Sequence, residues 1–164
     1  SGRGGGASWI ARQYLPKEMV GLDFSPAAIA LSQQWHAGIV NLKFVEGDAE
    51  NLPFPDASFD VVINVESSHC YGDMPRFVEE VERILDRGGK FGWVDMRSVN
   101  MLEVTTRAFA QSGLVLQRED LLNKGVVRAL DAAETRKSEI IAKDSLKFLS
   151  LKQQYFSQHQ NSPS

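Results

Sequence analysis

The sequence predicts an α/β fold, in which a mostly parallel sheet carries helices on both of its faces. Short apolar runs rich in β-branched residues alternate along the chain with longer segments whose apolar residues recur at helical spacing. This alternation is typical of βαβ units with right-handed crossovers. The most strand-like run, 59–65, is almost continuously apolar, which indicates a parallel strand covered on both faces.

The first part of the chain opens with a glycine-rich loop, Ser1-Gly2-Arg3-Gly4-Gly5-Gly6. A helix is expected over 7–15, and Pro16 ends it because proline disrupts a helix interior. A second helix runs from Ser25-Pro26 to about Gly38, with serine as the N-cap and proline in the first turn. Two short strands are predicted beside the second helix, at 19–23 and 42–46. The candidate buried residues of the first helix are Trp9, Ile10, Tyr14 and Leu15.

The second part of the chain continues the alternation after the strand at 59–65. Asp73 and Pro75 begin a helix whose apolar residues form one stripe, and Arg87-Gly88-Gly89 ends it. The expected elements that follow are a strand at 90–95, a helix at 99–111 and a strand at 114–118. Residues 120–150 are expected to be mostly helical, either as a lid over an apolar substrate or as a cover for the sheet. We predict one domain over 1–157 and a loose polar tail at 158–164.

Length, net charge and cysteine content limit the kinds of partner and compartment that we expect for this protein. A chain of 164 residues is long enough for one domain with a real core. The net charge of −3 does not favour nucleic acid or an anionic membrane surface, so we expect neither a nucleic-acid partner nor stable membrane insertion. One cysteine, Cys70, rules out an internal disulfide and fits a reducing compartment, which we take to be the cytoplasm. The oligomeric state stays open.

The glycine loop and Asp23 together describe a site for a cofactor that contains a nucleoside. Glycines before a helix let backbone N–H groups approach a ligand closely. Asp23 stands about twenty residues further on, at the end of the next strand, where a carboxylate can accept both ribose hydroxyls. The plainer alternatives are an ordinary glycine turn and a carboxylate that caps the helix beginning at Ser25-Pro26.

Asp48 is a third candidate, in the loop after the strand at 42–46. It is either a turn residue or an acceptor for the adenine amino group at the same sheet edge. These three features alone do not separate a nicotinamide oxidoreductase from a methyltransferase.

Two later stretches favour the methyltransferase. One is Asp48-Ala49-Glu50-Asn51-Leu52-Pro53-Phe54 leading to Phe59-Asp60, and the other is Arg87-Gly88-Gly89-Lys90-Phe91. With them, residues 1–97 closely resemble the class I S-adenosylmethionine-dependent methyltransferases. The resemblance implies a Rossmann-like fold and S-adenosyl-L-methionine as cofactor. The stretch 64–71 looks most like the small-molecule and lipid branch, nearest to phthiotriol and phenolphthiotriol dimycocerosate methyltransferases, with sterol methyltransferases more distant.

The resemblance also implies roles for single residues in the cofactor site. Gly2 and Gly4 match glycines beside the methionine part of the cofactor. Asp23 matches the acid that binds the ribose, and Phe24 is placed against the adenine.

Further along the chain, Asp48 matches the acceptor for the adenine amino group, and Ala49 contributes backbone. Asn64, Val65 and Glu66 match the strand end that faces the reactive centre.

Methyl transfer to a hydroxyl requires removal of a proton, and His69 is the best-placed general base. Glu66 could orient His69 or bind the amino group of the cofactor. The alternatives are a histidine that packs in a loop and a solvated loop acid. The expected acceptor is a lipid, polyketide or sterol-like hydroxyl, and no metal ligands are predicted.

Several other polar residues are assigned to the surface. His36 has no evident partner, and the acidic run Glu79, Glu80 and Glu82 reads as the solvated face of its helix.

The match to the family pattern has gaps. The acid before the glycine loop and the first strand have no counterpart, Ser1 is not an initiator methionine, and no strand is evident after Phe148. We therefore expect a fragment that lacks the first strand and the last. A fragment that is marginally stable and inactive by itself remains an alternative. A nicotinamide oxidoreductase is another, although the Gly-Asp-Ala and Leu-Pro-Phe series argues against it.

Overall fold

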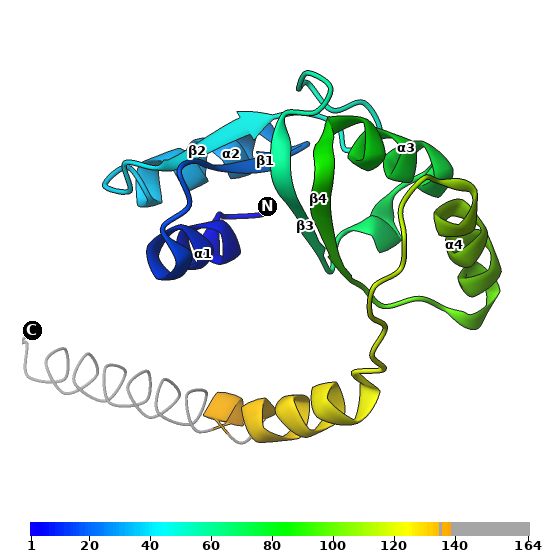
Figure 1. The fold of residues 1–164 in the computed structure, drawn as a ribbon. Coiled ribbons are helices and arrows are strands. Elements are labelled where there is room, and N and C mark those ends of the chain that lie inside the picture. The colour runs from blue at the N-terminus through cyan, green and yellow to red at the C-terminus, as the bar shows by residue number, and fades with distance from the viewer. Residues whose placement is uncertain (135, 139–164) are drawn as a thin grey trace, which may run out of the picture. The chain divides into compact units, whose positions relative to one another are not determined.

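A computed structural model describes residues 1–134 and 136–138 (Figure 1). The chain divides into two compact units, Ser1–Val115 and a second one that begins at Leu116. The first unit alternates helices and strands as predicted. Its elements are α1 (Gly5–Tyr14), β1 (Met19–Asp23), α2 (Pro26–Trp35), β2 (Leu42–Glu46), β3 (Phe59–Val65), the 3₁₀ turn η1 (Ser68–Cys70), α3 (Met74–Ile84), β4 (Leu85–Val94) and α4 (Val99–Gln111).

The strands pair in parallel, as the alternation predicts, but within the described residues they form two separate two-stranded sheets. β1 pairs with β2 from Met19↔Leu42 to Asp23↔Glu46. β3 pairs with β4, seen side by side in Figure 1, in a register that ends at Val65↔Val94. Each pair therefore brings two carboxyl-terminal strand ends together, and the loops that follow these ends carry the candidate site residues.

The prediction of which residues in and after α1 are buried is wrong for three of four, while the fourth, Ile10, is half-buried. Trp9, Tyr14 and Leu15 are 56%, 71% and 76% exposed, whereas Ala7 and Ala11 are buried. Two alanines four residues apart share one helix face and allow the close approach that bulky side chains would prevent. Ala7 joins a small core whose other buried members are Ile29 and Phe44.

The apolar stripe of α3 is confirmed and forms the larger core. Its buried members are Met74, Phe77, Val78, Val81 and Ala108, the last from α4. The helix begins as predicted, because the side chain of Asp73 accepts a hydrogen bond from the backbone N–H of Arg76 at 3.0 Å.

One face of β3 lies open, contrary to the prediction that both faces are covered. Val61, Ile63 and Val65 are 54%, 46% and 58% exposed, while Val62 packs against the larger core. Because side chains alternate between the two faces of a strand, these three valine and isoleucine side chains share the open face. The continuous apolar run therefore did not show whether one face or both faces of the strand are covered.

Several element bounds differ from the predictions: α1 begins at Gly5, inside the predicted glycine loop, and α2 ends at Trp35. β4 begins at Leu85, directly after α3, and residues 87–89 form an irregularity between the pairs Phe59↔Leu85 and Val61↔Lys90. Gly88 has a φ of 81°, which explains the glycine at this point. Residues 114–118 form no strand, because no neighbouring strand of the described chain pairs with them.

Glu80 is buried, so its assignment to the solvated face of α3 is wrong. The side chain is 3% exposed and accepts hydrogen bonds from Arg83 at 2.8 Å and from the backbone N–H of Leu52 at 2.8 Å. The hydrogen bond from Arg83 is the largest influence on the Glu80 carboxyl and lowers its pKa, although burial opposes this. Glu80 thereby fastens the Leu-Pro-Phe turn to α3.

In the second unit, residues 123–134 and 136–138 are helical, as expected for that part of 120–150. Residues 120–122 are not helical, so the helix begins later than predicted. The rest of that prediction and the predicted tail at 158–164 lie outside the described residues. Among the described helices, none combines the length and the apolar character that crossing a membrane requires.

Candidate cofactor and catalytic site

Asp23 contacts the glycine loop, as a residue of a shared cofactor site should. Its Oδ2 accepts from the backbone N–H of Gly2 at 2.7 Å and from the amino group of Ser1 at 3.0 Å. Its Oδ1 accepts from the backbone N–H of Ser25 at 3.0 Å, so Asp23 also forms the turn that precedes α2, whose N-cap is Ser25. Burial raises the pKa of Asp23, but the hydrogen bonds from Ser25, the Ser1 amine and Gly2 outweigh it and lower the pKa overall.

Position 4 requires glycine, both for its backbone conformation and because a neighbouring side chain approaches it closely. Its φ is 78°, in the left-handed region, and it is the N-cap of α1. A Cβ at this position would lie 2.5 Å from Cζ of Phe44. The aromatic ring therefore reaches the loop closely because glycine stands there.

The loop after β2 lies beside Asp23. The backbone N–H of Gly47 donates to the carbonyl of Asp23 at 3.0 Å. Asp48 accepts from the backbone N–H of Glu50 at 2.9 Å, which is the turn-forming role, and Ala49 packs against the larger core. Phe24 is 76% exposed, so its ring is free of the cores. The residues assigned to ribose and adenine thus gather around the ends of β1 and β2.

The end of β3 carries a buried polar atom without a partner. Asn64 donates from Nδ2 to the hydroxyl of Tyr71 at 3.0 Å, but its Oδ1 has no partner among the described residues although it is buried. Val65, next along the strand, is half exposed. A buried acceptor without a donor costs free energy, so Asn64 is suited to a ligand that brings an N–H or O–H group.

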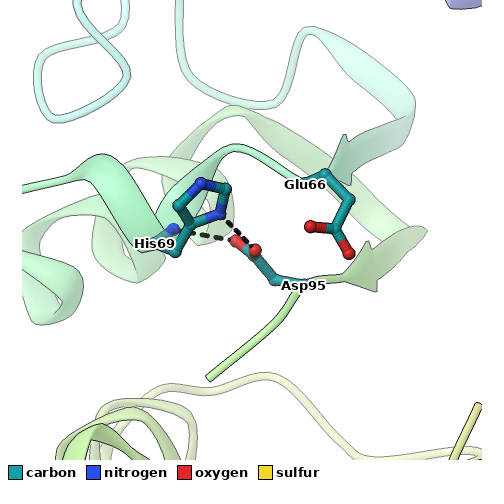
Figure 2. Close-up of side chains that lie close together, drawn as sticks. All are labelled: Glu66, His69 and Asp95. Atoms are coloured by element: carbon teal, nitrogen blue, oxygen red, sulfur yellow. Dashed lines mark hydrogen bonds and ion pairs between the residues drawn. The ribbon is translucent and has the colours of Figure 1, made fainter. Parts of the chain in front are cut away.

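His69 forms a close pair with Asp95 (Figure 2). Nδ1 of His69 lies 2.6 Å from Oδ1 of Asp95, whose side chain is fully buried. The backbone N–H of His69 also donates to Asp95, at 2.9 Å. A carboxylate only accepts, so Nδ1 carries the proton and the other ring nitrogen, Nε2, which points away from Asp95 in Figure 2, holds the lone pair of the neutral ring.

Asp95 is held in its ionised form by its neighbours. Ser68 donates to it from Oγ at 2.6 Å, and Arg97 lies 3.9 Å away. Ser68 in turn accepts from Arg97 at 2.7 Å and from the indole of Trp93 at 2.9 Å. Burial raises the pKa of the Asp95 carboxyl, but the bonds from Ser68 and His69 and the charge of Arg97 outweigh it and lower the pKa overall.

Glu66 is near this pair but does not orient it. Ligand atoms of Glu66, His69 and Asp95 lie within 4.8 Å of one another, a spacing that a metal ion could also use. The charge of Arg97 beside Asp95 and the direct contact between His69 and Asp95 favour the hydrogen-bonded pair instead. Asp95, not Glu66, is the residue that fixes the imidazole ring.

Sequence reasoning missed Asp95, Ser68 and Arg97. A usable signal existed for Asp95: it closes the strand predicted at 90–95, and His69 follows the strand at 59–65. Adjacent parallel strands bring such ends together, but only the pairing of β3 with β4 shows that these two strands are neighbours.

Comparison with known proteins identifies the family. A model of the methyltransferase domain matches residues 1–92, more than half of the chain. The chain belongs to the class I S-adenosylmethionine-dependent methyltransferases. S-adenosyl-L-methionine is the cofactor of this family, which favours the methyltransferase interpretation over the nicotinamide oxidoreductase.

Two curated relatives are similar over most of the chain. The phthiotriol/phenolphthiotriol dimycocerosates methyltransferase of Mycobacterium leprae is 41% identical over 148 residues, which cover 90% of this chain and 54% of the relative. The fatty-acid O-methyltransferase of Mycolicibacterium smegmatis is 42% identical over 130 residues, which cover 79% and 47%. The chain thus spans about half the length of the curated relatives that it matches.

The fold is similar to that of two solved structures. The YcgJ protein of Bacillus subtilis is 31% identical with a TM-score of 0.56, over 59% of this chain and 42% of that one. A sarcosine dimethylglycine methyltransferase from Galdieria sulphuraria has a TM-score of 0.64 over 71% and 52%. At 18% identity, this second likeness shows the fold alone.

Proposed function

We propose that this methyltransferase moves the methyl group of S-adenosyl-L-methionine to a hydroxyl oxygen of a lipid-like acceptor, with His69 as general base. The observation that carries the proposal is the His69–Asp95 pair at the ends of β3 and β4. A hydroxyl is a weak nucleophile until a base takes its proton, and a histidine with its lone pair on an accessible nitrogen suits that task. The side chain of His69 is 38% exposed, so a substrate can reach it.

The cofactor supplies a methyl group on a sulfonium, which leaves as a neutral thioether. With the cofactor bound, Nε2 of His69 would accept the proton of the acceptor hydroxyl, whose oxygen would take the methyl group from the sulfonium. Asp95 holds the ring through Nδ1 and stabilises the imidazolium that results. Because its pKa is lowered, Asp95 stays ionised while His69 takes the proton.

The cofactor side of the site is assigned to the loops at the strand ends. The glycine loop, with Gly2 and Gly4, cradles the methionine part of the cofactor, and Asp23 accepts the ribose hydroxyls. Asn64 supports this proposal, since its Oδ1, which has no partner in the described part of the chain, offers a buried acceptor to a donor such as the cofactor amino group. Asp48 then binds the adenine amino group.

The names of two relatives bear on the acceptor. One is a phthiotriol/phenolphthiotriol dimycocerosates methyltransferase and the other a fatty-acid O-methyltransferase. A fatty-acid carboxylate is the second candidate acceptor. Unlike a hydroxyl, an ionised carboxylate carries no proton to remove, so it needs no general base.

This difference provides the test. The chain would be given radiolabelled S-adenosyl-L-methionine with a long-chain alcohol, a phenol or a fatty acid, as wild type and as His69→Ala. We expect transfer to a hydroxyl in the wild type and a loss of about a hundredfold or more in H69A, the range typical of general bases. Hydroxyl methylation at the wild-type rate in H69A would exclude His69 as the base. Transfer to the fatty acid alone, unaffected by H69A, would favour the carboxylate acceptor.

We propose a location in the cytoplasm. Cys70, the single cysteine, is free and exposed in the structure, which suits the reducing cytoplasm.

A further inference from the structure

Helix α2 holds two consecutive carbonyl groups of the glycine loop. The hydroxyl of Ser32 donates to the carbonyl of Gly2 at 3.1 Å. One turn later, Nε2 of His36 lies 3.1 Å from the carbonyl of Arg3. A carbonyl oxygen only accepts, so His36 donates from Nε2. His36 therefore has a partner, and the prediction that it is a simple surface residue is wrong.

Further contacts surround these two hydrogen bonds to the loop. Ser32 is fully buried, and its Oγ also lies 2.8 Å from the carbonyl oxygen of Ala28, so its single proton is shared between two acceptors. Among the described residues, Nε2 of His36 has the loop carbonyl as its one acceptor. The guanidinium of Arg3 lies over the ring of Trp35, 5.6 Å from its centroid. The loop is thus attached to α2 through side chains spaced at 32, 35 and 36, which share one helix face.

The direction of a carbonyl also sets the direction of the next N–H. In a trans peptide unit the two groups point to opposite sides. With the carbonyl of Gly2 turned toward α2, the N–H of Arg3 points away from that helix. The bond from His36 to Arg3 fixes the following peptide unit in the same manner, and Gly4 donates its own N–H to the carbonyl of Ser1 at 3.0 Å.

We propose that His36 and Ser32 are positioning residues for the cofactor: by binding the loop carbonyls, they pre-order the glycine loop for the ligand. This inference rests on the proposed role of the loop as cofactor cradle. Ordering the loop before binding removes an entropic cost from the binding step, so cofactor affinity should depend on donors that never touch the cofactor.

The test compares His36→Leu, His36→Gln and Ser32→Ala by calorimetric titration with S-adenosylhomocysteine. H36L removes the donor, and we expect its affinity to fall by about fivefold to tenfold, as for one lost hydrogen bond. H36Q places an amide donor at a similar reach and should restore most of the affinity. Gln33→Leu is the matched control, because Gln33 on the same helix donates to the carbonyl of Phe44, outside the loop.

A second measurement does not depend on binding. The heteronuclear ¹⁵N NOE of the loop amides reports backbone order on the picosecond to nanosecond timescale. H36L should lower these values for the loop glycines, and Q33L should not. If H36L kept both the affinity and the amide order of the wild type, this inference would be overturned, and the proposed cofactor site would not be affected. If the wild-type chain did not bind S-adenosylhomocysteine, the inference would fall together with the proposed cofactor site.

Discussion

Nδ1 of His69 lies 2.6 Å from Oδ1 of Asp95, a residue 26 positions further along the chain. The contact joins the loop after β3 to the residue that follows β4. Since the parallel pairing of the two strands brings these ends together, the geometry of the pair is set by the sheet and not by a flexible loop alone. The fully buried carboxylate gives His69 a defined tautomer and a compensating charge.

The first prediction concerns Asp95→Asn. An amide can no longer stabilise the imidazolium with a negative charge, and it can hold the ring in either tautomer. We expect methylation of a hydroxyl acceptor to fall by about a hundredfold, within the range of general-base catalysis. Initial rates and S-adenosylhomocysteine affinity would be measured together, because affinity should change little. The control is Glu66→Gln, because the carboxylate of Glu66 lies near His69 but does not hold its ring. A larger loss in E66Q than in D95N would reverse the two assignments.

The second prediction concerns Asp23→Asn and its dependence on pH. Loss of a charged acceptor should weaken S-adenosylhomocysteine binding by about tenfold or more. The pKa of Asp23 is lowered, so the carboxylate stays ionised as the pH falls from 8 to about 5. The affinity difference between wild type and D23N should therefore be constant over that window and shrink only below the ordinary carboxyl pKa. Titrations at three pH values, with exposed Asp60→Asn as control, would check it.

The third prediction compares Gly4→Ala with Gly5→Ala. Alanine at position 4 would adopt a left-handed φ and press against Phe44, whereas a Cβ at position 5 meets nothing within 4 Å. We expect G4A to lower the free energy of unfolding by about 2–3 kcal/mol and to weaken cofactor binding. G5A should be neutral or slightly stabilising, because alanine favours the helix. Urea denaturation measures both. Equal stability in the two variants would contradict the close packing of the loop.

The fourth prediction concerns Glu80→Gln in α3. Removing the charge leaves Arg83 without its buried partner, and we expect a loss of about 2 kcal/mol in the free energy of unfolding at neutral pH. The pKa of Glu80 is lowered by folding, so its contribution is complete above the ordinary carboxyl pKa and disappears as the pH falls through the lowered one. The gap between wild type and E80Q should therefore close in acid.

The comparison variant for that experiment is Glu79→Gln, because the side chain of Glu79 is 66% exposed and its pair with Arg76 is screened by water. Denaturation curves from pH 7 to pH 3 would separate the two variants. A gap for E80Q that widened in acid would show that the carboxyl is not the stabilising group.

Local patterns were enough to locate most elements of the first unit. The strands β1, β2 and β3 have the predicted bounds, and Ser25 and Asp73 cap the helices that they were expected to begin. Capping, proline placement and β-branched runs act within a few residues, so a single sequence displays them. The predicted strand at 114–118 failed because a strand also needs a partner, which local pattern does not specify.

By itself, the sequence determined the order of helices and parallel strands, the family resemblance, and the positions of Asp23 and His69 at strand ends. The tertiary structure decided which distant groups meet. It buried Glu80, exposed Trp9, brought Asp95 to His69 and turned His36 toward the glycine loop. The physical reason is the range of the interactions: periodicity and capping depend on neighbours in sequence, whereas burial and side-chain hydrogen bonds depend on neighbours in space.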